Sequence, residues 1–258
     1  MNTAKLWKCA IGCCLMLALA LALSAGATSA GPGRGDLTAR FADVPRAERD
    51  GATYYLRGRV TTVMVTGVMP DAETGLPATD FVALFAIDDD AKRITPIYID
   101  GDTIVSVEGE SLPMGKVYGL GEDSQRNCLR MLDAVNRLLG HELIESYMAV
   151  DLEGITEIAE FSALRGDTRE RLHLLRLAMQ SIPSKQLNRM YGAISAYLTT
   201  DMKSGEVMRM IDKTDRYEIA ATVDLPVLPA QAEDEPPVPD AARISELVLD
   251  LFFETELL

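Results

Sequence analysis

Four short apolar runs follow one another along the chain: RVTTVMVTG at residues 59–67, DFVALFAI at 80–87, RITPIYI at 93–99 and DTIVSV at 102–107. They are rich in β-branched and aromatic residues, and turn-forming residues separate them, which is the pattern of consecutive β-strands. Asp88-Asp89-Asp90, between the second and third runs, is interpreted as a solvated hairpin turn. A calcium loop would need regularly spaced oxygen ligands and a distal Glu, and neither is present.

Beyond these strands the apolar period lengthens to that of a helix. Residues 122–139 predict an amphipathic helix closed by Gly140 as C-cap. Strands interleaved with helices predict an α/β layered sandwich. The apolar face of the first helix comprises Cys128, Leu129, Leu132, Val135, Leu138 and Leu139. Further strands are expected at 143–150 and 217–224, and further helices at 152–161, 167–181, 184–197, 204–213 and 241–258.

The N-terminus has the three parts of an export signal. Lys5 and Lys8 precede the apolar run CAIGCCLMLALALAL at residues 9–23, and small residues follow. Ala25-Gly26-Ala27 fits the small-x-small cleavage pattern, whereas residues 9–27 are just long enough to cross a membrane. A cleaved signal and a retained single-pass anchor therefore both stay open, and in either case the remainder works outside the cytoplasm.

The pattern divides the chain into five parts. Residues 1–27 are a signal or membrane anchor, 28–56 a tether, 57–225 one α/β domain, 226–240 a Pro-rich acidic linker and 241–258 a terminal amphipathic helix. We expect the apolar ending LFFETELL to dock on the body.

Composition excludes several classes of function. The net charge of -14 argues against nucleic acid, whose phosphates require a basic face. Cys128 is the only cysteine beyond the N-terminal segment, so the mature chain can form no internal disulfide, and a buried role is expected for it. His141 and His173 have no metal-ligand spacing and are interpreted as structural. The sequence has no P-loop, dinucleotide fingerprint, HExxH or GxSxG motif.

An ordered series of blocks resembles the LytR-CpsA-Psr (LCP) family. RGRVTTVMVTGVMP at 57–70 resembles its opening strand, Thr79-Asp80 the start of the next strand, and Asp102-Thr103 the end of the return strand. Residues 116–121 and YMAVDLEG at 147–154 match the following blocks in order. The resemblance runs from about residue 57 onward. It implies an α-β-α sandwich with a central mixed β-sheet.

The resemblance also implies a function. Such proteins face the outer side of the bacterial cytoplasmic membrane and transfer glycopolymers from a polyprenyl-pyrophosphate carrier to peptidoglycan. Phosphoryl transfer needs Mg²⁺ and Arg forks to neutralise charge on the phosphate oxygens. The resemblance places the two metal-binding carboxylates at Asp80 and Asp102, with Arg169 and Arg171 as catalytic clamp residues and Arg165 and Lys116 in substrate binding. From the residues alone, an Asp at a strand end can equally be a turn former, and the arginines can be a solvated helix face.

The chain departs from the family pattern at the arginines that bind the phosphates. The family carries Pro-Arg-Asp-Thr where this chain has Asp100-Gly101-Asp102-Thr103, so a phosphate-binding Arg is replaced by Gly. Leu172 follows Arg171 where the family has Gln, and the segment between Ile158 and Gly166 is short. Two hypotheses stay open. One is a weakened phosphotransferase, and the other is a non-catalytic module that binds an envelope lipid, glycan or protein.

Overall fold

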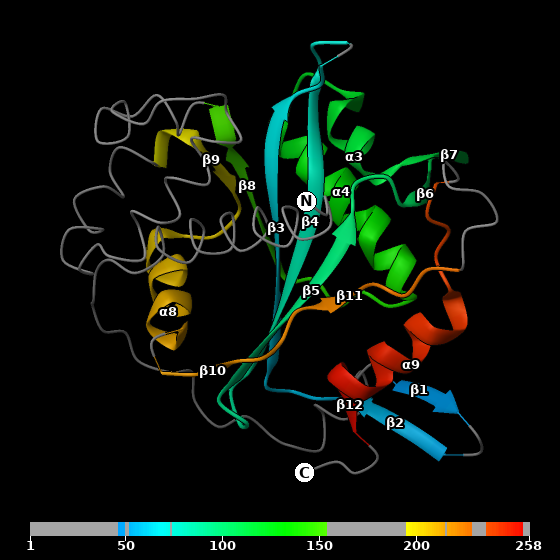
Figure 1. Ribbon diagram of the computed structural model, residues 1–258. Helices are drawn as coiled ribbons and strands as arrows, with labels where there is room; N and C mark the ends of the chain where they lie inside the picture. The colour runs from blue at the N-terminus through cyan, green and yellow to red at the C-terminus, as the bar shows by residue number, and fades with distance from the viewer. Residues whose placement is uncertain are drawn as a thin grey trace, which may run out of the picture.

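A computed structural model describes residues 46–49, 52–72, 74–153, 195–214, 216–228 and 236–254 (Figure 1). The predicted signal or anchor at 1–27 lies outside these ranges. So do Arg165, Arg169 and Arg171, and nearly all of the helices expected between 152 and 197. Among the described residues, no helix is long and apolar enough to cross a membrane.

A mixed sheet forms the centre of the molecule. β3 (Val60–Pro70), β4 (Pro77–Asp88) and β5 (Arg93–Asp100) are antiparallel neighbours, as the apolar runs predict. β8 (Ser146–Asp151) adds to β3 in parallel, which makes the sheet mixed. Its remaining strands are β9 (Leu198–Thr200), antiparallel to β8, and the short β10 (Glu218–Ile219) and β11 (Val223–Asp224), both parallel to β5. The strand expected at 217–224 is thus two pieces.

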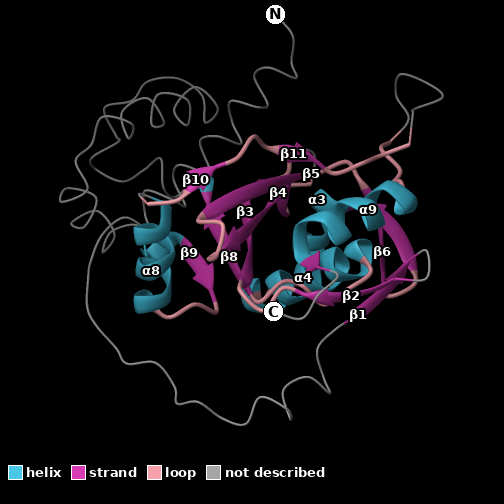
Figure 2. Cartoon of the chain, turned by 90° about the horizontal axis from the view of Figure 1, so that it is seen from below, coloured by secondary structure: helices cyan, strands magenta, loops and turns pink. Residues whose placement is uncertain are grey.

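Helices lie on both sides of this sheet (Figure 2). α4 (Ser124–Leu139) and α9 (Ala241–Phe252) are on one side, and α8 (Ser204–Thr214) is on the other. Consecutive residues 82–87 of β4 are all buried, which requires cover on both faces. The predicted α/β layered sandwich is therefore confirmed.

α4 shows how well a local signal defines a helix. The Asp123 side chain accepts a hydrogen bond from the Arg126 amide at its start, and Gly140 ends it with φ 75°. Cys128, Met131, Val135 and Leu139 are buried along one face. The prediction for Leu129 was wrong: its side chain is 50% exposed. The buried stripe is centred on the 128–131–135 line, and Leu129 lies one residue, or about 100°, away from it.

A second, three-stranded sheet joins the two ends of the described chain. β1 (Arg46–Arg49) pairs with β2 (Ala52–Leu56), and β2 pairs with β12 (Phe253–Glu254), all antiparallel. Part of the expected tether is therefore structured. The terminal helix ends at Phe252 rather than running to 258, because Phe252 and Phe253 are buried and the chain turns into a strand. The expected docking of the apolar ending on the body is confirmed for these residues.

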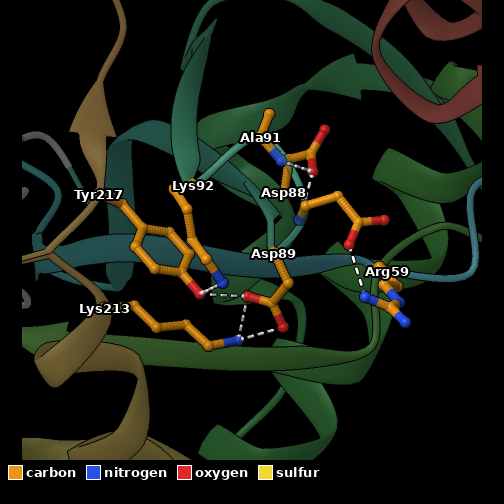
Figure 3. A network of polar contacts seen from close by, with 8 residues as sticks. Arg59, Asp88, Asp89, Ala91, Lys92, Lys213 and Tyr217 are labelled. Carbon is orange, nitrogen blue, oxygen red and sulfur yellow. Dashed lines mark hydrogen bonds and ion pairs between the residues drawn. The ribbon is translucent and has the colours of Figure 1, made fainter.

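The linker and the acidic hairpin turn are also ordered where they are described. The Leu228 amide donates to the Val238 carbonyl, and the amide of Ile104, at the start of β6 (Ile104–Val107), donates to the Pro237 carbonyl, so the end of the linker lies beside the start of β6. β7 spans Glu110–Pro113. The turn at Asp88-Asp89-Asp90 connects β4 and β5 as predicted. Asp89 accepts hydrogen bonds from Lys213 Nζ and Tyr217 Oη, both at 2.9 Å (Figure 3).

Candidate functional site

One edge of the central sheet collects the chemically interesting residues. β3, β5 and β8 run in the same direction, and β4 runs against them, so the carboxyl ends of three strands and the start of β4 meet there. Ligands of open α/β sheets bind outside the carboxyl ends of strands. Asp80 lies at the start of β4, and Asp102 follows the end of β5.

The predicted metal-binding residues are brought to neighbouring positions of this edge. Phe81 pairs with Asp100, so the backbone of Asp80 lies beside the turn at 100–103. The Asp102 amide donates to Asp100 Oδ1 at 2.9 Å, and the Thr103 amide donates to the Asp100 carbonyl at 3.0 Å. Asp102 itself is exposed. The Asp80 side chain lies outside what the structure describes.

A short helix closes this end through backbone contacts. α3 (Met114–Val117) continues into the 3-10 helix η1 (Tyr118–Leu120). The Gly115 amide donates to the Gly101 carbonyl at 2.7 Å, and a Cβ on Gly115 would overlap the carbonyl oxygen of Thr79. Only glycine permits this approach. Lys116, the predicted substrate-binding cation, follows directly and is exposed at the same edge.

A cavity of about 350 Å³ opens on the other side of the first residues of β4. Its volume is at the lower end of the roughly 300–1,000 Å³ that ligand sites occupy. Pro77 lines it, and so does Val68, which pairs with Thr79, the residue before Asp80. The other described lining residues are Val68, Met69, Pro70, Gly75, Tyr118, Ser124, Ala149, Asp151, Glu153, Ala196, Tyr197 and Thr199.

The cavity wall is polar and lacks described cations. Asp151 and Glu153 contribute carboxylates, and none of the described lining residues is Lys, Arg or His. Burial raises the pKa of Tyr118 more than its hydrogen bonding to Ser124 lowers it, so its phenol is neutral at physiological pH. Burial also raises the pKa of Cys128, next to Tyr118, to about 12. This thiol is fully buried and unsuited to act as a nucleophile.

Sequence reasoning missed most of this cavity. Tyr118 and Asp151 lie within quoted blocks, 116–121 and 147–154, but neither was singled out. Tyr197 and Thr199 carry no motif and reach the cavity only because β9 pairs with β8. The structural interpretation of His141 agrees with its ring contact to Phe253 at 5.0 Å between centroids.

The donor atoms at the edge are of the type that Mg²⁺ prefers. Within the described side chains, no group of three or more His, Cys, Asp or Glu residues could hold a metal ion. Mg²⁺ usually keeps several waters and binds through one or two carboxylates plus substrate phosphates. Asp102 and a second carboxylate from the adjacent Asp80 would meet that requirement.

The fold has solved counterparts, although no protein-family model and no curated protein matches the sequence. TagV of Bacillus subtilis superposes with a TM-score of 0.53 at 13% identity, over 76% of this chain and 98% of TagV. A protein described as a transcriptional regulator from Enterococcus faecalis gives 0.52 at 14% identity, over 75% and 87%. TagT bound to LI-WTA gives 0.51 at 12% identity, over 75% and 90%.

The fold is LCP-like. The order of the matched blocks in the sequence agrees with this. At identities of 12–14%, the similarity to these structures establishes the fold and no more.

Proposed function

We propose that this is an extracytoplasmic cell-envelope protein that binds a glycopolymer carried on polyprenyl pyrophosphate, as a divergent relative of the LCP phosphotransferases. The observation that supports this most directly is the cavity beside the Asp80–Asp102 edge in an LCP-like fold. A solved structure of this fold, TagT, holds the wall teichoic acid ligand LI-WTA. A lipid-carried substrate further favours a retained N-terminal anchor over a cleaved signal.

In this proposal Asp80 and Asp102 hold Mg²⁺ together with water and phosphate oxygens. The ion would neutralise negative charge on the oxygens of the pyrophosphate. Lys116 is a positively charged side chain that the structure places at this edge. Arg165, Arg169 and Arg171 are proposed as further phosphate contacts.

Catalysis is expected to be weak. Gly101 is buried in the turn, where it accepts from the Gly115 amide, and it offers no guanidinium beside Asp102. Loss of one preorganised charge partner typically costs about 10²- to 10³-fold in rate. This observation favours the second candidate function, a non-catalytic glycan- or lipid-binding module on the same scaffold.

The test uses the full chain in detergent with a polyprenyl-pyrophosphate-linked disaccharide and Mg²⁺. Binding is measured by thermal shift, and transfer or hydrolysis by release of the lipid phosphate. Asp102→Asn and Asp80→Ala should remove the Mg²⁺-dependent part of the thermal shift and any turnover. Asp90→Asn, in the turn at the opposite end of the sheet, is the matched control and should change neither.

The outcomes separate the two functions. Binding with turnover supports the phosphotransferase, and binding without turnover supports the non-catalytic module. If the lipid-linked ligand gives no shift with or without Mg²⁺, the proposed function is wrong.

A further inference from the structure

Thr103 is a buried polar residue at the sheet edge that carries Asp102. Its side chain is only 1% exposed. Its backbone is held on both sides, because its amide donates to the Asp100 carbonyl at 3.0 Å and its carbonyl accepts from the Met114 amide at 2.8 Å. Within the part of the chain that the structure describes, its hydroxyl has no hydrogen-bond partner. Burying such a group costs free energy, so its presence calls for an explanation.

Packing alone does not explain this hydroxyl. Valine has nearly the same shape, with a methyl group in place of the hydroxyl, and would fill the position without burying an unpaired polar atom. Two other buried threonines near this edge are paired, since the hydroxyl groups of Thr66 and Thr79 share a hydrogen bond. Thr103 therefore offers a hydroxyl donor that is fixed in place and that the protein fold itself does not use.

The surroundings of Thr103 connect it to both predicted metal-binding residues. Thr103 directly follows Asp102 in the chain. The first residue of α3 donates to the Thr103 carbonyl, and the second lies against the carbonyl of Thr79, the residue before Asp80. The start of α3 thus holds the two segments that carry the carboxylates, and the Thr103 hydroxyl is buried where these segments meet.

β4 has a register shift at Asp80. Val82 pairs with Thr66 of β3, whereas Thr79 pairs with Val68, so three steps along β4 face two steps along β3. Such a β-bulge changes the direction of a side chain, and bulges are common next to functional sites. A carboxylate carried by an irregular stretch of strand needs additional contacts to hold one orientation.

We propose that Thr103 is a positioning residue of the Mg²⁺ site, whose hydroxyl donates a hydrogen bond to a carboxylate oxygen that binds the ion. The inference deepens the proposed function and rests on it for the ion itself. Carboxylates that bind metals are themselves held by further hydrogen bonds, which fix their orientation and support the affinity. The hydrogen of a hydroxyl rotates to suit its acceptor, while the backbone contacts of Thr103 keep the oxygen in place.

The test measures binding of the metal alone to the full chain in detergent. Mn²⁺ is the probe in place of Mg²⁺, because electron paramagnetic resonance reads its free concentration. Thr103→Val removes the hydroxyl and keeps the shape, and it should weaken Mn²⁺ binding about tenfold. Thr103→Ser keeps the hydroxyl and should retain most of the affinity. Tyr147→Phe removes another fully buried hydroxyl, near the start of β8, and is the control that should bind Mn²⁺ as the unchanged protein does.

Thermal unfolding gives a second readout, which a purely structural role of Thr103 would not produce. In EDTA, Thr103→Val should be at least as stable as the unchanged protein, because it removes a buried donor without a partner. Added Mn²⁺ should raise the Tm of the unchanged protein more than that of Thr103→Val, because ligand binding stabilises in proportion to affinity.

The outcomes separate this inference from the proposed function. The inference alone is overturned if Thr103→Val binds Mn²⁺ as well as the unchanged protein, or if Thr103→Ser or Tyr147→Phe loses as much affinity as Thr103→Val. If the unchanged protein binds no Mn²⁺, the inference and the metal-binding role of Asp80 and Asp102 are both wrong. Failure of the lipid-linked ligand to bind, with the effect of Thr103→Val on Mn²⁺ intact, overturns the proposed function alone.

Discussion

The two ends of the central sheet both carry acidic residues, but they are built differently. At the β4–β5 turn, Asp89 is held between Lys213 and Tyr217, and Lys92 Nζ donates to the same tyrosine at 3.3 Å (Figure 3). At the other end, Asp102 is exposed and Asp151 and Glu153 line an open cavity. That end is held together by backbone contacts of Gly115 and Gly119.

The difference indicates what each end is for. The ion pair between Asp89 and Lys213 joins the β4–β5 hairpin to α8 and contributes to stability. A polar cavity and an exposed carboxylate at the carboxyl ends of strands are features of ligand sites. Four experiments test this contrast, in order of expected effect.

The largest effect is expected at Cys128, which lies behind the cavity wall. Because its pKa is raised from 9.0 to about 12, the thiolate fraction in the folded protein should be about a thousandfold lower than in the unfolded chain. Iodoacetamide labelling at pH 8, read by mass spectrometry of the peptide containing residue 128, should be correspondingly slow. The same reaction in denaturant is the control. Fast labelling of the native protein would mean that the cavity extends past Tyr118.

The second experiment addresses the backbone contacts at the end of the sheet that carries Asp102 and the cavity. Gly115→Ala forces a methyl group against the Thr79 carbonyl, and overpacking of this kind should lower the free energy of unfolding by about 3 kcal/mol. Gly58→Ala is the matched control, since nothing lies within 4 Å of the added carbon, and it should change stability by less than about 1 kcal/mol. Urea denaturation measures both. Equal effects would show that the close approach is not needed.

The third experiment weakens the other end of the sheet, at the β4–β5 turn. Asp89→Asn removes the ion pair with Lys213, whose Nζ lies 2.7 Å from Asp89 Oδ1, and should lower the free energy of unfolding by about 1 kcal/mol because both side chains are only partly buried. Asp90→Asn, which breaks the more exposed pair with Arg59, should cost less than half as much. If Asp89→Asn were as stable as the unchanged protein, the pairing of Asp89 with Lys213 would contribute nothing to stability.

The smallest effect is a pH dependence of the same pair. Burial of Asp89 opposes its ionisation, but hydrogen bonds from Lys213 and Tyr217 outweigh this and lower its pKa below 3.8. A lowered pKa gives stability that is present above the unfolded value and lost as pH falls through the folded value. The difference in unfolding free energy between the unchanged protein and Asp89→Asn should thus be constant above about pH 5 and shrink below pH 3.8. A difference that persists at pH 2 would rule out the ionised carboxylate as its source.

Much of the fold could be predicted because its signals are local. The strand runs at 59–67, 80–87 and 93–99, the acidic turn between two of them, and the helix from Ser124 with its Gly140 cap all appear as predicted. A turn residue or a helical period acts within a few residues, so it is readable from the sequence. The placement of Asp80 next to the Asp102 turn also agrees with the family resemblance. A resemblance to a known fold indicates which distant segments lie side by side, whereas the apolar period of one segment does not.

The sequence by itself determined the three antiparallel strands β3, β4 and β5, the helix α4 and the burial of Cys128. Only the tertiary structure decided what those elements face. Leu129 has the same apolarity as its buried neighbours and is exposed because packing selects one stripe of α4. β2 and β12 pair across nearly the whole described chain, and the cavity wall includes residues of β3, the start of β4, η1, α4, β8 and the segment 196–199. Such contacts depend on sheet order and register, which no local pattern specifies, so the site at the sheet edge had to be found in three dimensions.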